Sequence, residues 1–150
     1  MYTLPDDAAS SLSQLLEMWH GISANRLPNK HDMQFDALVS DHPGLFVVKQ
    51  TDQGWAEVDF EILNAGPELI RHNNRMMIGS LVSEVLSVST FSYVPEIFQN
   101  CLNNGEPHYW EIMIREYGEP PFQYQRLALP LFDEQGVGTS ILGSCVYFDA

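Results

Sequence analysis

The sequence predicts one α+β domain, a five-stranded antiparallel sheet with short helices on one face and an N-terminal amphipathic helix on the other. Three observations lead to this prediction. The chain of 150 residues is 45% hydrophobic, enough to build the core of one domain. Two strand-like segments are followed by several short helical segments and then by three more strand-like segments. In the last two strands, apolar residues occupy both alternating positions, so both faces of the sheet should be covered.

Residues 11–24 carry the clearest helical pattern. Their apolar side chains recur at intervals of three and four, which forms one stripe: Leu12, Leu15, Leu16, Trp19 and Ile22. Each large side chain contributes about 1.5–3 kcal/mol when buried, so this stripe must be covered. We expect the helix to pack on the outer face of the sheet, in its own subunit or exchanged with a neighbour, and to help form a homodimer. Residues 1–10 are then an N-terminal tail and residues 11–150 the domain.

The remaining elements follow from turn formers and periodicity. Residues 45–48 and 55–63 are predicted strands, joined as a hairpin through the turn formers of residues 51–54. Residues 67–73 and 91–104 are predicted helices, the second ending before Gly105. Three strands are then predicted over residues 109–117, 122–132 and 139–148, each bounded by glycine, proline or acidic turn residues.

The charge excludes two classes of partner. Asp and Glu outnumber Lys and Arg by 20 to 7, and the seven basic residues are scattered. Nucleic-acid binding needs clustered Lys and Arg, and anionic membranes repel an acidic surface. No apolar run is long enough to span a bilayer, and the N-terminus lacks the pattern of a signal peptide. We therefore expect a cytoplasmic protein with reduced Cys101 and Cys145, and no nucleic-acid or membrane partner.

Several short motifs resemble one known family. The order of elements is that of PAS domains, and the motifs are similar to a bacterial single-domain PAS subfamily that begins with a Leu- and Trp-containing helix. They are LLEMW at 15–19, RLP at 26–28, DMQFDAL at 32–38, FEILNAG at 60–66, MIGSL at 77–81 and LALPLFDEQG at 127–136. The resemblance implies a non-catalytic sensory domain that acts in bacterial signal transduction through protein contacts. Because little chain lies outside the domain, we expect its output to pass through a protein partner or through self-association.

The resemblance also implies a small-molecule cavity between the sheet and the helices. We expect the helical face of Val94, Ile97, Phe98 and Cys101 to meet the inner sheet face. Strand alternation assigns Phe60 and Ile62 to that inner face, together with Trp110, Ile112, Leu127 and Leu129. Such a lining favours a flat or fatty apolar ligand, whose identity the sequence does not give. The alternative is that these side chains simply fill a closely packed core.

Chemical motifs are sparse. The five histidines lack metal-ligand spacing, and His72, the first candidate for a haem ligand, lies in an early short helix. Asn100-Cys101 lacks the rest of the motif of flavin-binding photosensory PAS domains. We therefore expect no visible chromophore. Glu57, Asp59 and Glu61 alternate with apolar residues, which predicts a solvated outer strand face.

The sequence contains no motif of a nucleophilic, metal-dependent or phosphate-binding enzyme. We therefore predict a protein that is not an enzyme. Two other readings remain open at this point: a small-molecule carrier or sensor with a functional pocket, and a small enzyme built on a curved sheet.

Overall fold

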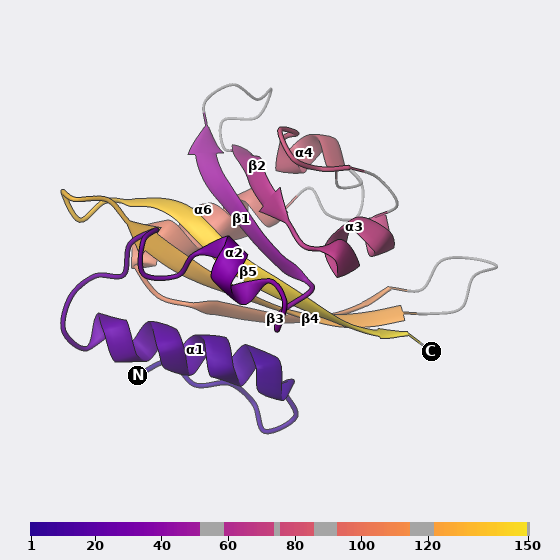
Figure 1. Ribbon diagram of the computed structural model, residues 1–150, viewed down its shortest axis with the longest axis horizontal. Coiled ribbons are helices and arrows are strands. Elements are labelled where there is room, and N and C mark those ends of the chain that lie inside the picture. The colour runs from indigo at the N-terminus through magenta and orange to yellow at the C-terminus, as the bar shows by residue number, and fades with distance from the viewer. Residues whose placement is uncertain (52–58, 74–75, 86–92, 115–121, 150) are drawn as a thin grey trace.

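The computed structural model describes residues 1–51, 59–73, 76–85, 93–114 and 122–149 (Figure 1). The observed order of helices and strands follows the predicted order. The elements are α1 (Ser10–Ser23), α2 (Phe35–Leu38), β1 (Leu45–Thr51), β2 (Asp59–Ala65), α3 (Pro67–Asn73), α4 (Val82–Val85), α6 (Val94–Asn104), β3 (His108–Ile114), β4 (Phe122–Phe132) and β5 (Gly138–Asp149). The predicted turn at residues 51–54 and the first part of the second strand lie largely outside the described residues.

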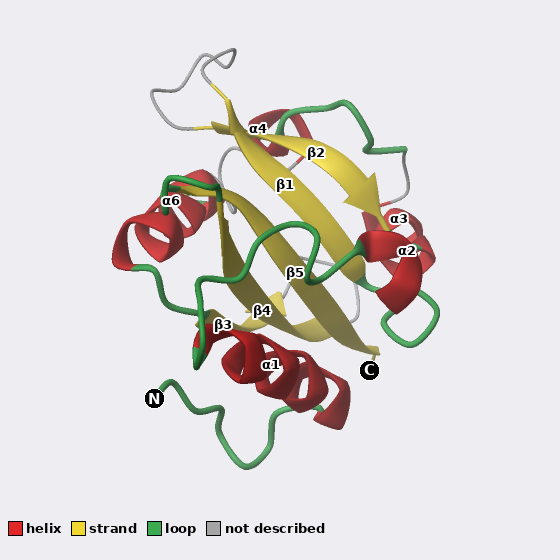
Figure 2. Ribbon diagram, turned by 60° about the vertical axis from the view of Figure 1, so that its left-hand side comes forward, coloured by secondary structure: helices red, strands yellow, loops and turns green. Residues whose placement is uncertain are grey.

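The five strands form one antiparallel sheet in the order β2-β1-β5-β4-β3. The first hairpin and the last three strands join where β1 pairs with β5. The last strand of the chain, β5, therefore lies at the centre of the sheet. Helix α1 lies on one face of this sheet, and α3, α4 and α6 lie on the other (Figures 1 and 2). The predicted fold class, including the N-terminal helix on the sheet, is confirmed.

The outer face of the sheet is covered by α1 from the same chain. Leu12 and Leu15 are fully buried, and they pack in one cluster with Leu127, Leu129 and Leu142 of the sheet. The indole Nε1 of Trp19 donates a hydrogen bond to the carbonyl oxygen of Pro130 at 2.9 Å. The apolar stripe predicted from the sequence is therefore the surface that α1 buries.

The first residues of the chain also lie against the sheet. The hydroxyl oxygen of Tyr2 accepts a hydrogen bond from the backbone N–H of Tyr109 at 2.7 Å, and the side chain of Tyr2 packs on the outer cluster. The backbone N–H of Ala9 donates to Oε1 of Gln125 at 2.7 Å. Residues 1–10, expected to be a tail, thus contribute contacts to β3 and β4.

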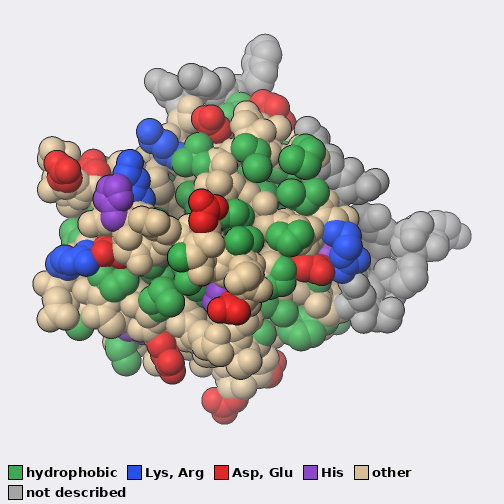
Figure 3. Space-filling model, in the orientation of Figure 1, with side chains coloured by type: hydrophobic (Ala, Val, Ile, Leu, Met, Phe, Trp, Pro, Cys, Tyr) green, Lys and Arg blue, Asp and Glu red, His purple; other side chains and the backbone are tan. Residues whose placement is uncertain are grey.

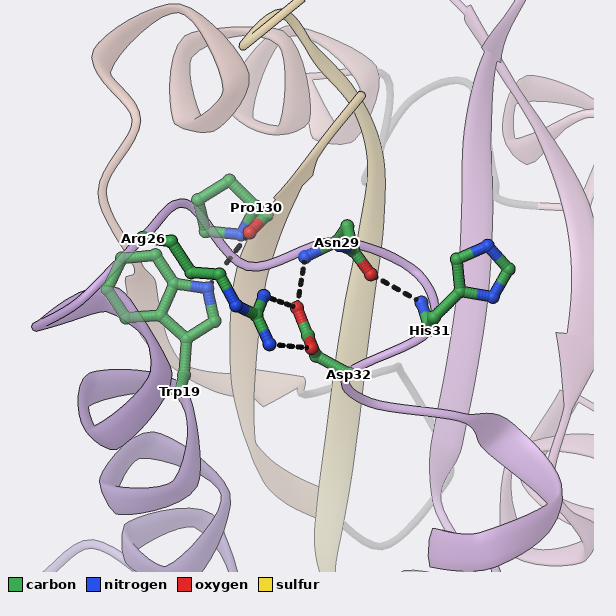
Figure 4. A network of polar contacts seen from close by, with 6 residues as sticks. All are labelled: Trp19, Arg26, Asn29, His31, Asp32 and Pro130. Atoms are coloured by element: carbon green, nitrogen blue, oxygen red, sulfur yellow. Dashed lines mark hydrogen bonds and ion pairs between the residues drawn. The ribbon is translucent and has the colours of Figure 1, made fainter. Parts of the chain in front are cut away.

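The connection after α1 is held by an ion pair, drawn in Figure 4. Both terminal nitrogens of Arg26 donate to the two carboxylate oxygens of Asp32, and the backbone N–H of Asn29 donates to the same carboxylate at 2.8 Å. The hydrogen bond from Arg26 lowers the pKa of Asp32 to about 2, although partial burial opposes this change. The pair lies beside the contact between Trp19 and Pro130 and closes the loop that leads away from α1.

This ion pair predicts a measurable pH dependence. The Arg26→Gln variant should raise the pKa of Asp32 toward the ordinary value of about 4. Because the carboxyl group has a lower pKa in the folded chain, its contribution to stability is present above about pH 4 and is lost as the pH falls toward 2. A carboxyl-carbon NMR titration measures this directly. The Lys30→Gln variant removes a neighbouring exposed charge and serves as the control; an unchanged Asp32 pKa in Arg26→Gln would contradict the assignment.

Asp59 is buried, contrary to the expectation of a solvated outer face. Its side chain is 0% exposed, and Oδ1 accepts hydrogen bonds from the backbone N–H groups of Phe60 at 2.9 Å and Ser83 at 3.3 Å. The hydroxyl of Ser83 donates to Oδ2. The partner is 24 residues away, on α4, so local alternation does not reveal it. Glu61 is partly exposed, and Glu57 lies outside the described residues.

Removing this carboxylate should destabilise the fold. In Asp59→Ala, buried N–H groups lose a charged acceptor, so the free energy of unfolding should fall by about 1.5–3 kcal/mol. Glu61→Ala, on the same strand and partly exposed, should change it by no more than about 0.5 kcal/mol. Urea unfolding followed by circular dichroism compares the two variants. Equal losses in both would mean that the contact between Asp59 and Ser83 carries no net stability.

Figure 3 shows how charged side chains lie on one face of the molecule. On the face drawn in Figure 3, Asp and Glu side chains are scattered among hydrophobic ones, and the few Lys and Arg side chains lie near its margins. Among the helices in the described part of the chain, none is both long and apolar enough to cross a bilayer.

Candidate functional site

The candidate site is the layer of side chains between the inner sheet face and the helices α3, α4 and α6. Five of the predicted lining residues belong to this inner cluster: Phe60, Ile62, Phe98, Cys101 and Ile112. Trp110 lies on the same side of β3 but is 37% exposed. Their proposed role in ligand binding stays a prediction, since their position alone also suits a packed core.

Leu127 and Leu129 lie on the opposite face of the sheet, so their assignment to the inner face is wrong. Both are fully buried in the outer cluster beneath α1. Alternation divides β4 into two sets of residues, but because both sets are largely apolar it does not show which set faces inward. The inward set contains Tyr124, Arg126 and Ala128.

Phe98 of α6 lies at the centre of the inner layer. Its ring centroid is 5.6 Å from that of Phe60, in an edge-to-face arrangement, and 5.9 Å from that of Phe46. Helix α6 buries Phe98 and Cys101 on one face, as their spacing of three predicts, and ends at Gly105 with a left-handed φ of 67°. The helix therefore presents an aromatic ring to β1 and β2.

Arg126 is the feature of this layer that the sequence did not predict. It is only 4% exposed, and its guanidinium carbon lies 5.4 Å from the centroid of the Phe98 ring. Its Nε and Nη2 atoms are buried and have no hydrogen-bond partner among the described residues. The residue pairs with Trp110 on β3 and with Cys145 on β5, which places it on the central part of the inner sheet face.

A second polar group lies nearby on β3. Nδ1 of His108 is buried and likewise has no hydrogen-bond partner in the described part of the chain. Burial lowers the pKa of His108, and the positive charge of Arg126 lowers it further. The imidazole ring lies 5.7 Å from the ring of Trp110, in a stacked orientation. This part of the inner layer thus combines a fixed cation, a neutral imidazole and aromatic rings.

Comparison with known proteins adds information on the fold only. No protein-family model matches the sequence, and no curated protein matches it. Among solved structures, the PAS domain of Bordetella pertussis BvgS is similar, with a TM-score of 0.50 and 14% identity over 92% of this chain and 88% of that one. The light-state structure of the blue-light photoreceptor Aureochrome1 LOV is similar at a TM-score of 0.50 and 11% identity, over 78% of this chain and 90% of that one. The fold is PAS-like.

The thiols of this PAS-like domain are buried and poorly ionised. Burial raises the pKa of Cys101 to about 12 and that of Cys145 to about 11. The Sγ atom of Cys101 donates to the carbonyl oxygen of Glu106 at 3.1 Å. Because the thiolate is the reactive form, both cysteines behave as small apolar side chains at neutral pH.

His72, the first candidate for a haem ligand, is engaged with its neighbours in the PAS-like domain. Its ring stacks on Tyr147 with centroids 3.7 Å apart, and its Nε2 atom lies 3.4 Å from a carboxylate oxygen of Glu68 and 2.8 Å from Nη2 of Arg71. Across the described ranges, no group of three or more His, Cys, Asp and Glu side chains is arranged to hold a metal ion. In the described inner layer, by contrast, Arg126 and His108 both have buried nitrogens without a hydrogen-bond partner.

Proposed function

We propose that this PAS-like domain is a sensory or regulatory module of bacterial signal transduction that binds a small molecule between its sheet and its helices. The signal is passed on through protein–protein contacts, either with a partner protein or within a homodimer. The observation that supports ligand binding is that Nε and Nη2 of Arg126 have no hydrogen-bond partner among the described residues, in an otherwise apolar interior. A buried charge without a partner lowers the stability of the fold, so it is not expected in a core whose role is stability alone.

Catalysis is not part of the proposal. The inner-layer thiols have raised pKa values, which removes them as nucleophiles near neutral pH. The guanidinium of Arg126 has N–H donors and no acceptor, so it does not act as a general base. The described inner layer is therefore suited to binding and holding a molecule rather than to transforming it.

The test compares the full chain as purified with the same chain after unfolding in urea, dialysis and refolding, which releases small molecules. We expect amide hydrogen exchange to be slower in α6 and in the inner residues of β4 before ligand removal. We also expect a change in the oligomeric mass measured by light scattering, since a sensor must couple its ligand to a contact surface. Identical exchange and identical mass in the two samples would contradict the proposal.

A further inference from the structure

We propose that Arg126 anchors an anion site inside the domain, and that the ligand is a small organic acid whose carboxylate binds the Nε and Nη2 edge of the guanidinium. This assignment rests on the proposed function, namely that a small molecule binds between the sheet and the helices. It names the chemical class of that molecule and the residue that selects it.

The buried guanidinium of Arg126 has hydrogen-bond donors that no described acceptor satisfies. Arg126 is 4% exposed, and its guanidinium is a cation with five N–H donors and no acceptor. The ring of Phe98, 5.4 Å away, stabilises the flat face of the cation. This contact does not satisfy the N–H groups that lie in the plane of the guanidinium. Buried charged donors without acceptors are strongly disfavoured.

The two nitrogens without partners have a geometry that suits one kind of acceptor. Nε and Nη2 lie on one edge of the guanidinium, and both are buried without a partner among the described residues. Their two N–H groups point in nearly parallel directions, which matches the two oxygens of one carboxylate. A neutral acceptor such as a single carbonyl oxygen satisfies only one of them well. The pattern of unpaired donors therefore points to a carboxylate.

Two described acidic side chains of the sheet, Asp59 and Glu111, are already engaged elsewhere. Asp59 binds Ser83 and the backbone of Phe60. Glu111 accepts a hydrogen bond from the hydroxyl of Tyr109 at 2.7 Å, on the opposite side of β3 from the inner layer. Within the described ranges, no carboxylate forms an ion pair with Arg126, so the matching anion would come from a ligand.

The surroundings indicate the body of the acid. Phe98 and Trp110 flank Arg126 from α6 and β3, and Tyr124 shares its strand face. Aromatic walls favour a flat apolar group next to the carboxylate. The buried Nδ1 of His108 offers one further hydrogen bond to a polar substituent of such a molecule.

Calorimetric titrations with matched pairs of probes test the assignment on the full chain. The pairs are acetate with acetamide, phenylacetate with phenylacetamide, and indole-3-acetate with indole-3-acetamide; inorganic phosphate is added as a simple anion. We expect at least one acid to bind about 10–100-fold more tightly than its amide, because the charge-assisted pair of hydrogen bonds is lost in the amide. Binding should also shift the Nε–H NMR signal of Arg126, which requires no variant.

Three variants complete the test. Arg126→Met should remove the preference for the acid, Arg126→Lys should retain part of it, and Arg71→Met, a change at an exposed arginine on α3, should leave it unchanged. Without ligand, Arg126→Met should be at least as stable as the parent chain, since it removes an unpaired buried charge. If Arg126→Met fails to fold, Arg126→Lys and the Nε–H signal still decide the question.

The contradicting outcomes are distinct from a failure of the proposed function. Equal binding of every acid and its amide, or full acid binding by Arg126→Met, overturns the role of Arg126. Phosphate binding as tight as that of the best acid overturns the organic-acid class. A neutral molecule retained equally by the parent chain and Arg126→Met would leave the sensory function standing and overturn this inference alone.

Discussion

A chain lacking residues 1–24 is expected to aggregate or to remain unfolded. The four side chains that α1 buries, Leu12, Leu15, Leu16 and Trp19, each contribute about 1.5–3 kcal/mol. Together they match much of the total stability of an ordinary domain, about 5–15 kcal/mol. The deletion also uncovers the apolar outer face of β4 and β5. Light scattering and circular dichroism of the truncated chain measure both effects.

Point substitutions in α1 distinguish the loss of buried packing contacts from the other effects of deleting residues 1–24. Leu15→Ala should lower the free energy of unfolding by about 2–5 kcal/mol, because the Leu15 side chain is fully buried between α1 and the sheet. Met18→Ala, at a position that is 41% exposed on the same helix, should change it by about 0.5 kcal/mol or less. If the truncated chain is as soluble and stable as the full one, with unchanged mass, α1 is an appendage and the account of the outer face is wrong.

Phe98→Ala is expected to lower the free energy of unfolding, by about 3–5 kcal/mol if the inner layer is a filled core and by clearly less if Phe98 lines the proposed ligand site. The ring is 3% exposed, contacts the rings of Phe46 and Phe60, and lies under the guanidinium of Arg126. Its removal opens a void at the centre of the inner layer and takes away the cation–π partner of a buried charge. Urea unfolding measures the loss, and Asn100→Ala, an exposed position on α6, provides the control.

The size of the loss also distinguishes a filled core from the wall of a ligand site. In a filled core the full 3–5 kcal/mol is lost and no small molecule is involved. At the wall of an occupied site, the loss measured without ligand is smaller, and retention of the ligand is weakened. No change in either stability or ligand retention would contradict the central position of Phe98.

The sequence predicts those features that depend on local periodicity. The stripe from Leu12 to Ile22 identified α1 and the need to cover it, and the apolar residues at both parities of β4 showed that both sheet faces are buried. The spacing between Phe98 and Cys101 identified the inward face of α6. These predictions hold because helix and strand geometry fix the direction of each side chain relative to its neighbours.

The residues that sequence reasoning misplaced depend on contacts between distant segments. Leu127 and Leu129 belong to one of two apolar sets, and only the packing of α1 decides which set faces outward. Asp59 is buried because α4 supplies Ser83 from 24 residues away. Arg126 is one of the seven scattered basic residues, and nothing local marks it as buried. Its parity with Tyr124 and Ala128 assigns it to the inner layer once the leucines are assigned to the outer one.

Native mass spectrometry of the full chain, purified without added ligand, tests most directly whether a small molecule is held against Arg126. The account predicts that part of the parent protein carries a non-covalent adduct of small organic mass, and that Arg126→Met, shown to be folded by circular dichroism, lacks it. The bare mass of the chain in both proteins, or the same adduct in both, would contradict the account.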